Sequence, residues 1–83
     1  MVEGKKRLRL DQTASYQIRV QGMFPARWRD YIQGMDIIVE DDEECPVTML
    51  TGRLPDQAAL LGVLNFLYNQ RLPLLSVECL SIQ

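Results

Sequence analysis

The clearest pattern in the chain is an alternation of apolar and polar side chains that begins at Tyr16. Tyr16, Ile18 and Val20 are apolar and the residues between them are polar, which is typical of a strand with one buried face. The same period of two recurs at residues 35–40 and 75–79, so these segments are predicted to be strands as well.

A further strand is predicted at residues 47–54, but its buried face is left open by the sequence. Val47 and Met49 compete for the core with Leu50 and Leu54, which have the opposite parity. Gly52 is a candidate bulge position, because an extra residue there would switch the register.

A short helix is predicted between the first two strands. Pro25 suits a first helical turn, and Gly34 suits a left-handed cap at the end. Trp28, Tyr31 and Ile32 fall at i, i+3 and i+4 on one face. This helix must be stabilised by docking onto the sheet, since two or three turns are not stable alone.

A second, longer helix is predicted after Asp56, which serves either as its N-cap or as an acid of its first turn. Pro73 ends it, because the residue before a proline is disfavoured in the α region. Its apolar positions recur at helical spacing: Leu60, Val63, Leu64, Leu67 and Tyr68.

The element order is therefore strand, helix, strand, strand, helix, strand. Right-handed crossovers place both helices on the same face of the sheet. We expect an α+β fold of the ferredoxin-like split βαβ type, with a four-stranded antiparallel sheet, two helices on one face and strand order 4-1-3-2. Residues 1–14 are expected to be a flexible basic arm, and residues 15–83 a single α+β domain.

Composition supports one globular domain: 47% of residues are hydrophobic, 24% are charged and the net charge is −2. Apolar runs are only a few residues long, so we expect no membrane insertion and a cytoplasmic location. Cys45 and Cys79 are expected to be free, reduced thiols. Two cysteines without any histidine supply no metal site, and no cofactor motif is present.

Catalytic chemistry has little support, and we assign no catalytic residue. The absence of histidine excludes the usual Ser-His-Asp and Cys-His systems. The carboxylates do not occur in a pattern that both buries and pairs them. An enzyme is therefore less favoured than a non-enzymatic protein.

One loop offers an alternative function as a small anion- or phosphate-handling enzyme. Residues 19–24, Arg-Val-Gln-Gly-Met-Phe, resemble the phosphate-binding loop of acylphosphatases, a family with the same split βαβ order. That resemblance implies an anion site at Arg19, Gly22 and Arg27. The chain departs from the family because Pro25 and Ala26 separate Phe24 from the following arginine, and because residues 34–37 offer no asparagine to place a water.

The N-terminal arm offers a third alternative, contact with nucleic acid through phosphate groups. Its basic residues are Lys5, Lys6, Arg7 and Arg9. The five other basic residues are scattered among ten of the eleven acids, which argues against nucleic acid as the main partner.

The favoured hypothesis is an interaction or regulatory module that binds an unknown protein partner or self-associates. Alternation predicts that Ile38 and Leu74 point away from the helices, onto the open face of the sheet. An exposed sheet face with several apolar groups is a common place for association.

Several stretches, spread over residues 16–78, resemble a family of small uncharacterised proteins of cyanobacteria and actinobacteria. They are residues 16–22, Arg27-Trp28, Leu50-Thr51-Gly52, Pro55-Asp56-Gln57-Ala58-Ala59-Leu60 and Leu72-Pro73-Leu74-Leu75-Ser76-Val77. The resemblance implies a family without an assigned activity. The chain lacks the glycine expected after the second helix, near Gln70-Arg71.

Overall fold

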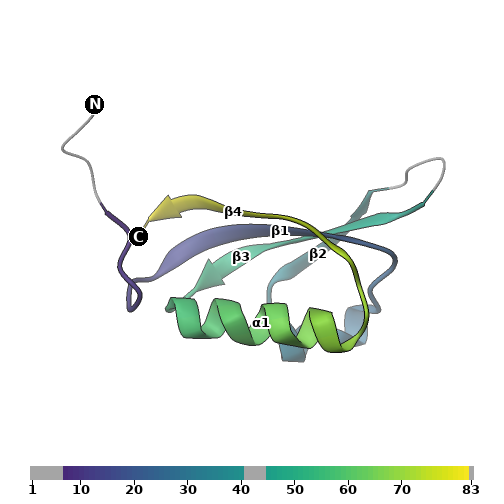
Figure 1. Cartoon of the computed structure of the whole chain (residues 1–83), viewed down its shortest axis with the longest axis horizontal. Coiled ribbons are helices and arrows are strands. Elements are labelled where there is room, and N and C mark those ends of the chain that lie inside the picture. The colour runs from purple at the N-terminus through teal and green to yellow at the C-terminus, as the bar shows by residue number, and fades with distance from the viewer. Residues whose placement is uncertain (1–6, 41–44, 83) are drawn as a thin grey trace.

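One four-stranded antiparallel sheet and two helices make up the fold in the computed structural model, which describes residues 7–40 and 45–82. The elements are β1 (Ala14–Gln21), η1 (Ala26–Ile32), β2 (Asp36–Glu40), β3 (Val47–Leu54), α1 (Gln57–Asn69) and β4 (Leu74–Ile82). Both helices lie on the same side of the sheet (Figure 1). The α+β class is confirmed, and the strand order β2-β3-β1-β4 is the predicted order counted from the other edge.

The core lies between β1, β3 and α1. β1 alternates strictly along its length, with Ala14, Tyr16, Ile18 and Val20 buried on the helix-facing side. α1 contributes Leu60, Val63 and Leu67 from one stripe, in agreement with the helical spacing of the sequence.

The first helix is a 3-10 helix of seven residues and not an α-helix. Its chain reverses through two consecutive left-handed residues, Gln33 (φ 60°) and Gly34 (φ 71°), so the predicted cap at Gly34 is shared with Gln33. A helix this short depends on tertiary contacts. Arg29 supplies one, since its guanidinium donates to the Met35 carbonyl and to Asp36 at 2.9 Å.

Aromatic rings join the two helices. Phe66 of α1 contacts Trp28 edge-to-face with ring centroids 5.6 Å apart, and it stacks on Tyr31 at 5.1 Å. Phe24 meets both Phe66 and Trp28 edge-to-face. Such pairs contribute about 0.5–1.5 kcal/mol each beyond their burial, so Phe66 fixes the position of η1.

The structure resolves which face of β3 is buried. Thr48, Leu50 and Leu54 face the helices, whereas Val47 and Met49 lie on the other side. The predicted bulge at Gly52 is wrong, because β3 keeps an unbroken register with β1 throughout. Gly52 instead allows close packing, since a Cβ there would lie 3.2 Å from the Cα of Met35.

The N-terminal segment contacts the domain from Leu8 onward. Leu8 is partly buried against the core, and the Leu10 carbonyl accepts a hydrogen bond of 2.8 Å from the Gln57 amide. The Thr13 hydroxyl donates to the Pro55 carbonyl at 3.2 Å. β1 begins at Ala14, within the segment expected to be a flexible arm.

Both ends of α1 follow from local chemistry. Asp56 is the N-cap, which is one of its two predicted roles. Its carboxylate accepts a 2.8 Å hydrogen bond from the Ala59 amide. At the other end Arg71 occupies the left-handed region with φ 63°, and its amide donates to the Tyr68 carbonyl at 2.9 Å. Arg71 thus takes the left-handed conformation for which a glycine was expected near this position.

We predict that Arg71→Gly stabilises the protein by about 1 kcal/mol, because a left-handed conformation costs an L-residue with a Cβ roughly that amount. For a domain of this size the melting temperature should rise by about 4–8 °C. The control is Arg71→Ala, which removes the same side chain but keeps the Cβ. If the glycine variant melts no higher than the alanine variant in a thermal scan, the backbone at residue 71 is not strained.

Candidate interaction surface along β4

β4 is an edge strand of nine residues, and its side chains are exposed on both faces from Leu74 to Ser81. Its neighbour β1 buries every second residue. The difference arises because the helices pack over β1, β3 and β2 and leave β4 uncovered. Figure 1 shows β4 as the outermost strand, on the side of the sheet away from β2.

The pairing of β4 with β1 shifts register twice, between Ser15 and Tyr16 and between Arg19 and Val20. Leu80 and Leu75 are left without a direct partner on β1 at these shifts. Between them the residues 76–79 pair regularly. Bulges of this kind are common at sheet edges.

The register shift at Leu75 corrects the predicted orientation of Leu74. Leu74 lies opposite Val20, whose side chain is buried under the helices, so Leu74 is on the helix-facing side and not on the open face. One extra residue reverses the alternation, which the sequence did not reveal. Ile38 pairs with Met49 and does lie on the face away from the helices, at the opposite edge of the sheet.

The sequence interpretation missed the other exposed apolar residues of β4. Val77 lies opposite Ile18 on the helix-facing side, yet it is 40% exposed because no helix covers it. Leu75 and Leu80 are exposed as well. An apolar alternation at residues 75–79 resembles that of a half-buried strand, so only the placement of α1 could show that this strand is open.

α1 contributes further exposed apolar side chains on the side of the molecule where β4 lies. Leu61 and Tyr68 are exposed and lie seven residues apart, which is about two helical turns, so they form one stripe. Phe66, which contacts η1, projects about 150° away from this stripe. In Figure 1, α1 and β4 lie toward the viewer, with β2 and η1 behind them.

We call this region the β4 surface and define it by six exposed side chains. They are Leu74, Leu75, Val77 and Leu80 of β4 with Leu61 and Tyr68 of α1.

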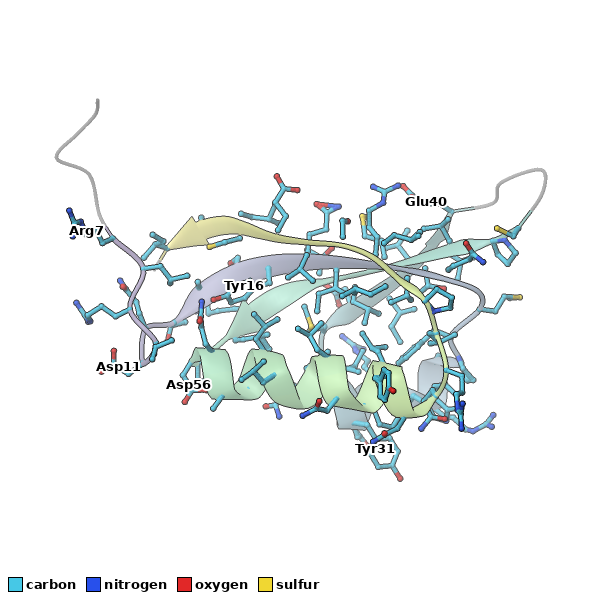
Figure 2. All side chains as sticks on the ribbon, viewed as in Figure 1. Arg7, Asp11, Tyr16, Tyr31, Glu40 and Asp56 are labelled. Carbon is cyan, nitrogen blue, oxygen red and sulfur yellow. The ribbon has the colours of Figure 1, made fainter. Side chains whose placement is uncertain are left out.

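An apolar hollow of about 450 Å³ continues the surface at the start of α1. Leu10, Leu60 and Leu61 line it, together with Asp11 and Asp56, which lie close to the first helical turn in Figure 2. Both carboxylates have partners, since Asp56 caps α1 and Asp11 pairs with Arg9 at 3.3 Å. The hollow therefore favours apolar contact over ion binding.

The residues of the acylphosphatase-like loop do not converge. Arg19 lies on the face away from the helices and forms an ion pair with Glu40, whereas Arg27 is exposed on η1. Gly22 (φ 113°) lies between them, and its amide donates to the Pro46 carbonyl at 2.8 Å. The preceding amide of Gln21 donates to the Pro73 carbonyl at 2.9 Å. Two amides that a phosphate cradle would use are thus engaged by carbonyls, and the loop joins the starts of β3 and β4.

Thr48 also holds the loop at Gly22. It is fully buried, and its hydroxyl donates a 2.7 Å hydrogen bond to the Gly22 carbonyl. We predict that Thr48→Val, which keeps the volume, costs about 1 kcal/mol, because the half-buried Gly22 carbonyl loses its hydrogen-bond partner. Thr48→Ser keeps the hydroxyl and serves as the control. Equal urea midpoints for the valine variant and the parent would show that this hydrogen bond does not hold the loop.

The basic residues proposed for nucleic acid are only partly described. Lys5 and Lys6 lie outside the described residues, Arg7 is exposed, and Arg9 forms an ion pair with Asp11. The nucleic-acid alternative stays a prediction. Within residues 7–40 and 45–82, no three side chains of the metal-ligating types gather, and no helix is long and apolar enough to cross a membrane. Cys45 and Cys79 are free, as predicted.

Fold and surface together define a small α+β domain with one open, apolar sheet edge. The chain belongs to the family described as domain of unknown function DUF8691, whose model matches residues 15–78. The prediction of a family without an assigned activity agrees with this match, while the organisms in which it occurs stay a prediction. Comparisons with curated proteins and with solved structures give no match.

Proposed function

We propose that the protein is a non-enzymatic interaction module that binds a partner protein along β4. The observation that carries this proposal is the exposure of β4 on both faces: five of its nine residues are large and apolar, and four of these are exposed. Natural sheets protect their edges with prolines, lysines, short strands, bulges or a covering element. β4 contains no proline or lysine, is nine residues long, and carries Glu78 as its single charged residue. Its two register shifts lie on either side of residues 76–79, which stay regular and open to pairing.

Strand addition is the binding mode that suits this edge. On the outer side of an edge strand, backbone N–H and C=O groups of alternate residues lack a ladder partner. An extended segment of another protein would pair with them, and its side chains would contact the β4 surface. Backbone hydrogen bonds then contribute affinity, and Leu74 and Val77 contribute selectivity for apolar side chains.

The other edge of the sheet is less suited to this role. β2 has five residues and ends in carboxylates, Asp36 and Glu40. Each is held in an ion pair, with Arg29 and Arg19 respectively. The acidic residues 41–44 follow directly in the sequence, and charges at an edge oppose pairing.

We also propose that the domain is of the ferredoxin-like split βαβ class. The strand order and the position of both helices on one side of the sheet support this assignment. The short 3-10 helix η1 in place of a full first α-helix is the departure from that class.

A photo-crosslinking amino acid at position 77 tests the proposed function in the native cell. We expect it to capture a protein on illumination, because Val77 lies within the proposed contact. The matched control is the same amino acid at position 39 of β2. Val39 is 41% exposed, almost the same as Val77, and it is also on an edge strand.

Capture that depends on position 77 and is absent at position 39 supports the proposed function, whether the captured protein is a second copy or another chain. Equal yields at the two positions, or no adduct at position 77, would contradict it. Mass spectrometry of the adduct identifies the captured protein.

A further inference from the structure

We propose that the occupant of the β4 surface is a second copy of this chain, bound by antiparallel pairing of the two β4 strands about a two-fold axis through Val77. This inference rests on the proposed function and names the partner. It would join two sheets into one of eight strands, and such self-complementary interfaces are the commonest in soluble oligomers.

The geometry of pairing determines which faces meet. Antiparallel edge strands related by a two-fold axis require that axis to be perpendicular to the sheet, so the helices of both copies lie on one side. Residues directly opposite each other then share a face. Val77 therefore meets Val77 on the helix-facing side, where it is only partly covered within one chain.

Glu78 selects the register. With the axis at Glu78, the two carboxylates would lie directly opposite, and like charges in that position are destabilising. With the axis at Val77, Glu78 of each copy lies opposite Ser76 of the other. A serine hydroxyl donates to a carboxylate, so Glu78, the single charged residue of β4, gains one hydrogen-bond donor in each copy.

The residues that flank the regular stretch are also compatible. Leu74 and Leu75 lie on one side of residues 76–79 and Leu80 lies on the other, so the flanks are apolar. The regular stretch of residues 76–79, between the two register shifts, contains the axis. Antiparallel pairing of two β2 strands about an axis at their central residue, Ile38, would place Asp36 opposite Glu40. These like charges repel each other, which argues for β4 as the self-pairing edge.

A second copy also covers apolar groups beyond the strand itself. The stripe of Leu61 and Tyr68 lies on the side of α1 away from η1. Two such stripes would border the paired β4 strands on the helix side, one from each copy. A single extended peptide would cover the edge but would supply no second helix to border Val77.

Light scattering over a range of concentrations tests the association. We expect a species of twice the 9.6 kDa chain at high concentration. Val77→Lys places two ammonium groups opposite each other on the axis and should weaken dimerisation at least tenfold. Val39→Lys, with equal exposure on β2, should leave it unchanged. Circular dichroism identical to the parent shows that both variants are folded.

Disulfide trapping tests the register. Val77→Cys is made in a Cys45→Ser background with Cys79 retained, and the oxidised dimer is mapped by mass spectrometry. The proposed register gives a 77–77 link, because opposite residues are close enough for a disulfide after a small adjustment. A 77–79 link would place the axis at Glu78 and overturn the proposal. Val39→Cys in a Cys45→Ser, Cys79→Ser background should give no dimer.

The two proposals fail in different ways. A chain that stays at 9.6 kDa at every concentration, together with a position-77 adduct to another protein, overturns the second copy and leaves the proposed function standing. A monomer without any adduct at position 77 overturns both. Association that Val77→Lys and Val39→Lys weaken equally also overturns pairing through β4.

Discussion

The whole structure depends on the helix-facing side of β1. This strand has a partner on each edge, and its inward residues Tyr16, Ile18 and Val20 are buried beneath α1. Loss of one such side chain to alanine typically costs 2–5 kcal/mol, a large part of the stability of a domain this small. β3, β4 and α1 are all positioned by their contact with this one strand or its immediate neighbour.

The open edge follows from how little helix the chain has. Four strands at about 4.8 Å spacing form a sheet wider than one helix, whose diameter with side chains is about 10 Å. α1 has 13 residues, and η1 with seven residues lies beside it, held by the rings around Phe66. Together they cover β1, β3 and β2. The strand beyond β1 has no helix above it, so apolar residues that would be core in a larger domain are exposed.

The sequence predicted the parts that depend on local chemistry. Alternation identified β1, the bounds of β3 agree with residues 47–54, and Asp56 caps α1. The errors arise where tertiary geometry decides. A bulge at Leu75 turned Leu74 to the other face, and Gly52 serves close packing against Met35.

The candidate site was predicted only in part for the same reason. Ile38 and Leu74 are exposed apolar residues, as expected, but they lie on opposite edges and opposite faces. Val77 could not be singled out, because alternation alone describes a buried strand and an uncovered strand equally well. The information that separates them is the width of the helical layer, which is a property of the whole fold.

The magnitude of the exposed apolar area indicates what kind of association this edge can support. Leu74, Leu75, Val77 and Leu80 are each about half exposed, so covering one contributes about 1 kcal/mol. Association itself costs roughly 4–15 kcal/mol in lost freedom. A few such side chains offset that cost only when backbone hydrogen bonds along the strand are added, each contributing about 1 kcal/mol net. Binding along β4, as proposed, is therefore expected to be reversible and to depend on concentration.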